Sequence, residues 1–305
     1  ISETMVYAVG MTGGFYAVSR ETGKPVWQKN LAQEFPPADT FRWGYAQSPS
    51  LYKNLVILAP QATNAFVAAF DSQTGALAWK SGDLGGAGYS TPVIHSIAGV
   101  DQAVMVSAGG TGGVTGLSLE DGSQLWRYEG WNCRIPIPHA TLLPGDRLFI
   151  TGEYGAGSAI IQITKSGDAF SVQEIKKLPE LESQIHPPLL IGDHLYLNSN
   201  GNQRNDGMAC ATLDGEILWQ TRNTEAAPRF ERGNLIYADG MILNFDGKTG
   251  ILHLIEPSPE GYKEIARTPV LFDSIKMWSP MALSNGRLLL RSQEQLKCLD
   301  LRPAA

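Results

Sequence analysis

Arginine and aromatic side chains are the residues of this 305-residue chain best suited to recognising a ligand. A guanidinium group offers a rigid fork of donors to carboxylate or sulfate, and aromatic rings carry much of the energy of recognition surfaces. The segments rich in such residues contain Arg42, Trp43, Tyr45, Tyr89, Trp131, Asn132, Arg134, His186, Arg229, Arg232, Lys276, Met277 and Trp278. From these we predict a ligand-binding site of Arg42, Trp43, Tyr45, Tyr89, Arg134, His186, Arg229 and Trp278. The alternative is that these side chains only wedge neighbouring repeats apart and cap the fold.

Motifs of known catalytic or metal chemistry are absent from the sequence. There is no phosphate loop, no His-Glu-x-x-His and no Gly-x-Ser-x-Gly. The glycine-rich run 109–116 is predicted to be a loop between strands, because a phosphate cradle needs a helix N-terminus behind it. The five histidines lack the spacing of metal ligands: His95, His139, His186, His194 and His253. The sequence therefore predicts no catalytic residue and no metal ligand.

A repeated phrase supplies the elements that would position the ligand-binding residues. Its clearest copy, Ala69–Trp79, reads Ala-Phe-Asp-Ser-Gln-Thr-Gly-Ala-Leu-Ala-Trp. Each copy is typical of a hairpin, with an alternating apolar strand, a turn closed by glycine and a second short strand. The turn glycines recur every 45 to 52 residues, which indicates a repeat architecture: Gly23, Gly75, Gly122, Gly167, Gly215 and Gly261.

A second hairpin precedes each phrase, so the repeat unit has four short strands. Tyr89–His95 and Gln102–Ser107 form the clearest of these upstream hairpins. We therefore expect an all-β fold, a β-propeller of four-stranded antiparallel blades, with seven blades and eight as the alternative. The expected organisation is a single domain, 1–305, with repeats at approximately 1–35, 36–84, 85–131, 132–180, 181–226, 227–272 and 273–305.

Recurrent tryptophans and prolines suggest how the blades are arranged. Proline suits the first residue of an inner strand, because it has no N–H to offer a neighbour. Four tryptophans that close the phrases are predicted to pack between adjacent blades: Trp27, Trp79, Trp126 and Trp219. Loops that join one blade to the next meet on one face of a propeller. We therefore expect Arg42, Arg134, His186 and Trp278 to share one basin over the channel mouth.

The two ends of the sequence predict an incomplete seam. Met5–Val9 reads as the second strand of a blade, and the last repeat offers only three strands. One inner and one outer strand are then missing, so the seam should expose strand edges that pair readily with other chains. On this interpretation the chain is part of a longer protein, and restoring its preceding segment should raise its stability.

The repeated phrase resembles the pyrroloquinoline-quinone-like (PQQ-like) β-propeller repeat, roughly Leu-Asp-x-x-Thr-Gly-x-x-x-Trp, over nearly the whole chain. That family includes quinoprotein dehydrogenases, BamB-type outer-membrane assembly propellers and secreted propellers, and its architecture is like that of WD40 and YVTN propellers. The segments Trp43–Pro49 and Gly88–Pro92 look closest to the secreted and BamB-type non-catalytic members. The resemblance implies a periplasmic or extracellular location. Its dehydrogenases use vicinal cysteines, calcium and a catalytic aspartate, and this chain has no Cys-Cys pair.

Composition and charge further limit the classes of function that the chain can have. A net charge of −6 disfavours a nucleic-acid partner, and no apolar run is long enough to span a membrane. The three cysteines form no spaced set and are predicted to be buried free thiols: Cys133, Cys210 and Cys298. We expect a non-catalytic binding scaffold without a cofactor, with a protein or a small polar or anionic ligand as partner. The alternatives are a PQQ- and calcium-dependent oxidoreductase, and a structural domain of a larger secreted protein.

Overall fold

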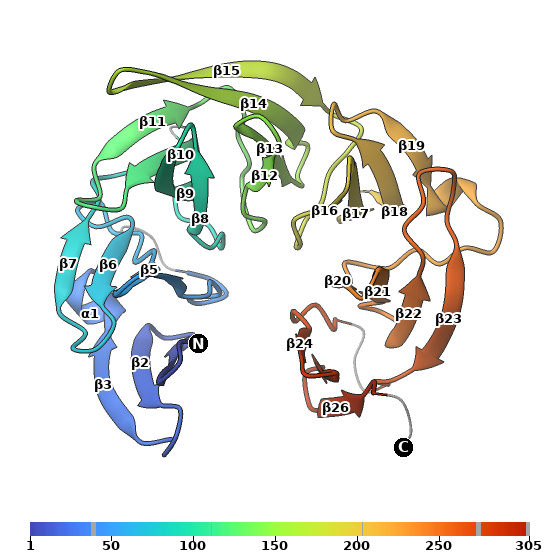
Figure 1. The fold of residues 1–305 in the computed structure, drawn as a ribbon, viewed down its shortest axis with the longest axis horizontal. Helices are drawn as coiled ribbons and strands as arrows, with labels where there is room; N and C mark the ends of the chain where they lie inside the picture. Colours follow the sequence, from blue (N-terminus) through green and yellow to red (C-terminus); the bar gives the residue numbers. More distant parts are fainter. Residues whose placement is uncertain (38–40, 111, 203, 273–275, 303–305) are drawn as a thin grey trace. The chain divides into compact units, whose positions relative to one another are not determined.

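The chain folds into a β-propeller, in agreement with the sequence prediction. The computed structural model describes residues 1–37, 41–110, 112–202, 204–272 and 276–302, and within these the strands form seven antiparallel sheets that follow one another along the chain (Figure 1). The contacts divide the chain into two compact units, unit 1 (Ile1–Lys177) and unit 2 (Leu178–Ala305).

Unit 1 contains the first four sheets, of three, four, four and four strands. The first sheet contains β1 (Met5–Val9), β2 (Gly14–Ser19) and β3 (Pro25–Asn30), and the second contains β4 (Ser50–Tyr52), β5 (Leu55–Leu58), β6 (Ala68–Asp71) and β7 (Leu77–Lys80). The third contains β8 (Val93–Ile97), β9 (Val100–Ser107), β10 (Gly113–Ser118) and β11 (Gln124–Tyr128). The fourth contains β12 (Thr141–Leu143), β13 (Arg147–Gly152), β14 (Gly157–Ser166) and β15 (Ala169–Leu178), whose last residue is the first of unit 2. Their strand order follows the sequence, as simple meanders do.

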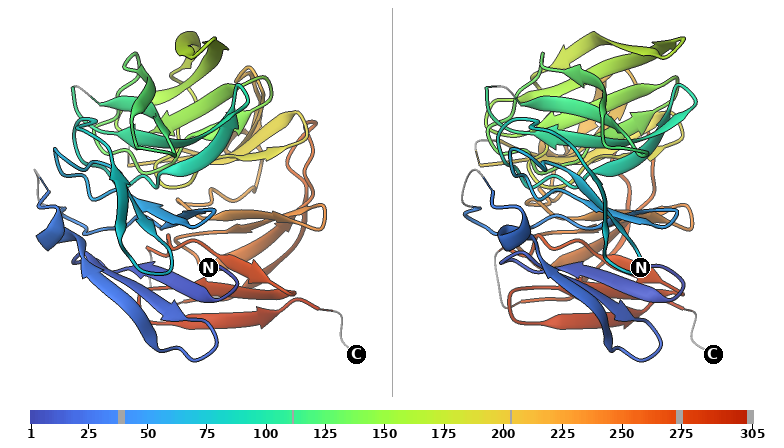
Figure 2. Two further views of the ribbon diagram at one scale, coloured as in Figure 1. Left: turned by 60° about the vertical axis from the view of Figure 1, so that its left-hand side comes forward. Right: turned by 90° about the vertical axis from the view of Figure 1, so that its left-hand side faces the viewer.

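Unit 2 contains the last three sheets, of four, four and three strands. They are β16 (Leu189–Ile191), β17 (His194–Asn200), β18 (Asn205–Thr212) and β19 (Ile217–Gln220); β20 (Leu235–Ala238), β21 (Met241–Phe245), β22 (Ile251–Ile255) and β23 (Glu264–Pro269); and β24 (Ala282–Ser284), β25 (Arg287–Arg291) and β26 (Leu296–Asp300). A 3-10 turn, η1 (Thr221–Asn223), follows β19. Figure 2 shows the sheets from two further directions.

The apolar core lies in layers between neighbouring sheets. Alternate residues of β5 point to opposite faces, so Val56 and Leu58 join the cluster shared with the first sheet, and Ile57 joins the cluster shared with the third. Because both faces are covered, the middle strands of a sheet read as continuous apolar runs. In unit 2 the same alternation places Ile242 against the fifth sheet and Leu243 against the seventh.

Glycine closes the repeat turns for two reasons. Gly75 and Gly122 have φ angles of 70° and 74°, in the left-handed region that disfavours a side chain. A Cβ at Gly122 would also lie 2.5 Å from Cε3 of Trp79, and a Cβ at Gly75 would lie 2.8 Å from Cδ2 of Trp27. Each turn of these two sheets is therefore seated against the ring of the preceding sheet's closing tryptophan.

Three details differ from the sequence expectation. The sixth phrase is expected to turn at Gly261, yet Gly261 is not among the positive-φ glycines, and eight residues (256–263) separate β22 from β23. Part of the glycine-rich run is strand, since β10 begins at Gly113. A one-turn helix that the four-strand unit does not predict, α1 (Leu31–Glu34), follows β3, and the side chain of Asn30 caps it by accepting from Gln33 N at 3.2 Å.

Candidate ligand-binding site

Each sheet has two ends with different connections. We call one end the loop side, because there the outer strand of one sheet leads to the inner strand of the next. We call the other end the turn side, because it carries the hairpin turns of the repeats. In unit 1 the loop-side segments bind one another in sequence. The backbone N–H of Tyr89 donates to the carbonyl of Pro136 at 2.8 Å, and that of Ser48 donates to Oγ1 of Thr91 at 3.0 Å. These bonds fix consecutive loops side by side.

Arg42, Trp43 and Tyr89 form one cluster on the loop side of unit 1. The Trp43 ring lies 5.4 Å from the Tyr89 ring, edge to face, and the guanidinium of Arg42 lies over Trp43 at 5.1 Å. The Tyr89 hydroxyl also accepts from the Trp43 backbone N–H at 3.4 Å. Trp43 is 50% exposed, so this ring is held in place from two loops and still presented to solvent. Such an arrangement suits recognition of a partner surface.

The remaining predicted site residues of unit 1 differ from each other in exposure. Tyr45 is buried and packs on Phe41, with ring centroids 4.7 Å apart, and burial raises the pKa of its hydroxyl. That hydroxyl is also buried without a hydrogen-bond partner among the described residues. Arg134 is exposed, and no carboxylate in the described part of the chain lies within 4.0 Å of its guanidinium. The structure thus assigns Tyr45 to the packing below the cluster and leaves Arg134 available to a ligand.

In unit 2, two of the three predicted residues are held by neighbouring side chains. His186 is buried, and its Nδ1 contacts the side-chain amide of Asn234, in the next sheet, at 3.2 Å. The Trp278 indole donates to Glu231 at 3.1 Å, and its ring lies 4.8 Å beneath the guanidinium of Arg232. The His186 contact joins the segment before β16 to the loop before β20, and the Trp278 contacts join the segment before β24 to the same loop.

Arg229, the third predicted residue of unit 2, is exposed on the same loop as Glu231 and Arg232. The sequence interpretation did not treat these residues as a set. Glu231 both binds Arg232 and accepts from the Trp278 indole. The sequence signal for this set is the run of charged residues Arg229, Glu231 and Arg232 in one loop. The expectation that Arg42, Arg134, His186 and Trp278 share one basin involves both units and stays a prediction.

The closing tryptophans lie between neighbouring sheets of one unit. The indole N–H groups of Trp27, Trp79 and Trp219 donate to carbonyls of the following sheet, those of Ser72, Leu119 and Ser258, at 3.1, 2.9 and 2.9 Å. Trp126 is also buried, but its N–H donates to Gln102 of its own sheet. In the fourth sheet Leu178 takes the place of the tryptophan and packs against Gly215.

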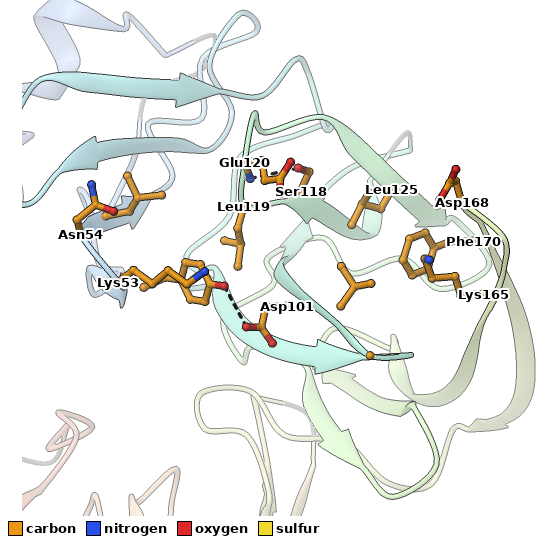
Figure 3. A pocket seen from close by; sticks show the side chains of 14 residues that line it. Lys53, Asn54, Asp101, Ser118, Leu119, Glu120, Leu125, Lys165, Asp168 and Phe170 are labelled. Atoms are coloured by element: carbon orange, nitrogen blue, oxygen red, sulfur yellow. Dashed lines mark hydrogen bonds between the residues drawn. The ribbon is translucent and has the colours of Figure 1, made fainter.

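A hollow of about 650 Å³ lies on the turn side of unit 1 (Figure 3). Both acidic and basic side chains line this hollow, and some of them contact other lining residues. The Tyr52 hydroxyl donates to Asp101 at 3.0 Å, Lys53 lies 4.8 Å over the Tyr52 ring, and on the other side Lys165 lies 5.8 Å over Phe170. These pairings favour neither sign of ligand charge.

The residues of the chain do not match the quinone and calcium chemistry of the PQQ-like dehydrogenases. Cys133 and Cys210 are buried, as predicted, and lie in different units. The prediction that Cys298 is buried was wrong, because this residue is exposed on β26, a strand of the last, three-stranded sheet. No two of the three cysteines are adjacent in sequence, so none can form a vicinal pair. Within the described residues no three His, Cys, Asp or Glu side chains cluster as metal ligands would. The vicinal cysteines and the metal-ligand cluster expected of such a dehydrogenase are therefore not found among the described residues. No described helix has the length and apolar character of a membrane span.

Comparison with known proteins places the chain among propellers of this kind. The family model described as outer membrane protein assembly factor BamB matches residues 1–221. The solved structure of BamB from Moraxella catarrhalis is similar at 14% identity, with a TM-score of 0.63, covering 97% of this chain and 81% of that one. A europium-containing methanol dehydrogenase is similar at 11% identity, with a TM-score of 0.64, covering 95% of this chain and 72% of that one. The WD40 repeats of RRP9 are similar at 11% identity, with a TM-score of 0.55, covering 94% of this chain and 83% of that one. No curated protein sequence matches the chain. These structural likenesses concern the fold alone.

Proposed function

Because the chain belongs to the family of the outer membrane protein assembly factor BamB, we propose that it is a non-catalytic binding module whose loop side recognises a protein partner. The observation that carries this proposal is the cluster of Arg42, Trp43 and Tyr89. A half-exposed tryptophan that contacts an arginine and, edge to face, a tyrosine has the composition of an interface hot spot. Because two loops already fix the ring, little conformational entropy is lost when a partner covers it.

The chemistry of the cluster indicates the kind of partner surface. Trp43 offers a flat apolar face, and the exposed guanidinium of Arg42 offers a charge-assisted contact to an acidic side chain. Arg134 adds a second exposed cation on the loop side of the same unit. We therefore expect a protein surface with an apolar centre and acidic flanks. A periplasmic or extracellular location is part of this proposal and is supported by the family.

A photo-crosslinking amino acid at position 43 tests the proposal in cells. We expect an adduct of one defined mass, and none from the same amino acid at Tyr16, which is 42% exposed on β2 and serves as the matched control. With that partner purified, Trp43→Ala and Arg42→Gln should each weaken binding about tenfold or more, and Tyr16→Ala should not. Absence of an adduct at position 43, or equal affinities for the three variants, would refute the proposal.

The enzymatic alternative is a PQQ-dependent oxidoreductase, since a methanol dehydrogenase shares the fold. We propose that the chain functions without this cofactor, and the scattered cysteines support that view. Addition of pyrroloquinoline quinone and calcium to the purified chain, followed by a dye-linked assay with alcohols and sugars, decides the question. Quinone absorbance that remains with the protein, together with dye reduction, would establish the alternative. A third possibility, a structural domain of a larger secreted protein, predicts no adduct at position 43.

A further inference from the structure

A second, smaller hollow lies on the loop side of unit 2 and differs in its chemistry from the one in Figure 3. Its volume is about 340 Å³. Its walls come from the loop before β20, the turn between β21 and β22, and strands β22 and β23. Three cationic side chains line it, Arg229, Lys248 and Arg267.

The carboxylates in the same walls already have partners. Glu231 binds Arg232 at 2.5 Å and accepts from Trp278, and Asp246 accepts the backbone N–H groups of Lys248 and Thr249 at 2.8 and 3.0 Å. By contrast, no carboxylate among the described residues lies within 4.0 Å of the charged groups of Arg229 or Lys248. Two of the three cations are therefore available to a ligand, and the hollow favours an anion.

The loop that carries Arg229 is held in an unusual conformation. Ala226, Phe230 and Arg232 all have positive φ angles, of 59°, 48° and 51°. A bulky residue rarely adopts this conformation, and it persists only where the surroundings enforce it. The Phe230 ring is fully buried against His253, at 4.9 Å, and the side-chain amide of Asn200 donates to the carbonyls of Arg229 and Phe230 at 2.6 and 2.9 Å. These contacts hold Arg229 at the rim of the hollow.

His253 gives an independent indication of a ligand. It lines the hollow, is 1% exposed, and its Nδ1 lies 2.7 Å from Oε2 of Glu264. Burial would raise the pKa of Glu264, but hydrogen bonds from Tyr262 and His253 outweigh it and hold the pKa below its ordinary value. Glu264 is therefore the acceptor, and His253 donates its Nδ1–H. Nε2, on the far side of the ring, has no hydrogen-bond partner among the described residues, and buried polar atoms rarely lack one.

We propose that this hollow binds a small hydroxycarboxylic acid, a sugar acid being the type that fits its chemistry. The carboxylate is bound by Arg229 and Lys248, and Arg267, which pairs with Glu264 at 3.4 Å, also lines the hollow. A hydroxyl of the same molecule forms a hydrogen bond with Nε2 of His253, the atom that has no partner among the described residues. The hollow lies in unit 2, so this site is independent of the partner cluster around Trp43 and is tested separately.

Calorimetric titration of the intact chain with gluconate and with hexanoate tests the proposal. Both probes are six-carbon monocarboxylates, but hexanoate has no hydroxyl. We expect one gluconate per chain, and about tenfold weaker binding for each of Arg229→Gln and Lys248→Gln, since each removes one charge-assisted contact. Both residues are exposed, so the variants should fold normally. Arg134→Gln, an exposed arginine of unit 1, is the control and should bind gluconate as the wild type does.

The His253 contact has its own readout. Gluconate should bind about tenfold more tightly than hexanoate and should shift the ring ¹⁵N signals of His253 in the wild type but not in Arg229→Gln. Equal affinity for the two probes, without a shift, would overturn the role of His253. Absence of gluconate binding, or binding that Arg229→Gln and Lys248→Gln leave unchanged, would overturn the site itself.

Discussion

Removing the ring of Trp79 should destabilise unit 1 more than any exposed substitution. The side chain is 6% exposed, packs on the turn of the next sheet, and donates to Leu119 O at 2.9 Å. Large aromatic residues replaced by Ala in a core cost about 3–5 kcal/mol, and the orphaned carbonyl adds roughly 1 kcal/mol. We therefore expect Trp79→Ala to lower the free energy of unfolding by about 4–6 kcal/mol. Trp79→Phe keeps much of the ring and should cost roughly 1–2 kcal/mol.

Urea denaturation followed by far-ultraviolet circular dichroism measures this loss. With a slope of about 3 kcal/mol per molar urea, the Trp79→Ala midpoint should fall by more than about 1 M. Trp43→Ala is the matched control, because this ring is half-exposed and its loss should change the free energy by about 0.5 kcal/mol or less. If Trp79→Ala and Trp43→Ala denatured at the same urea concentration, the packing role of the closing tryptophan would be wrong.

Two further predictions concern the chemical modification of the cysteines and the dependence of stability on pH. Cys298 is exposed, whereas Cys133 and Cys210 are buried, and burial raises the pKa of Cys210 to about 11. A thiol reagent near pH 8 should therefore modify one cysteine in the native chain and three after unfolding. Modification of Cys210 before unfolding would contradict this. Burial lowers the pKa of His95 and of His139 in the folded chain, so below about pH 6.5 the unfolded chain binds more protons and stability falls with decreasing pH. The double variant His95→Gln, His139→Gln should flatten that fall in thermal melting between about pH 6.5 and 5, and an unchanged slope would show that other groups cause it.

The fold was predictable because its signals are local. The turn glycine and the closing tryptophan are only four residues apart in sequence, and this spacing recurs in four of the repeats. The prediction of a tight turn at Gly261 was wrong, because eight residues join β22 to β23 and Gly261 does not have a positive φ. Helix α1 was missed because four residues carry no periodicity, and its cap at Asn30 is a single side chain.

The site was predictable only as a set of loops. Trp43 and Tyr45 are two positions apart and look equivalent in sequence, yet Trp43 is half-exposed and Tyr45 is buried. The two rings have different partners. Phe41 packs on the ring of Tyr45, and Tyr89, in a loop of the next repeat, contacts the ring of Trp43. The exposure of Trp43 thus depends on a contact between positions 43 and 89, which no local pattern encodes. His253 was given no role for a similar reason, because its partner Glu264 lies on the neighbouring strand.

If the proposed sites are correct, stability and recognition depend on opposite ends of the sheets in this chain. On the turn side, rings such as Trp79 seat against glycines of the following sheet, and a Cβ at Gly122 would clash with that ring. That end therefore tolerates little change. On the loop side, Arg42, Arg134 and Arg229 are exposed and have no ion-pair partner among the described residues, so replacing them removes no ion pair. Because the two ends are separated by the length of a strand, loop-side side chains can diverge without loss of the fold. A repeat of this kind can therefore keep its architecture while the ligand changes.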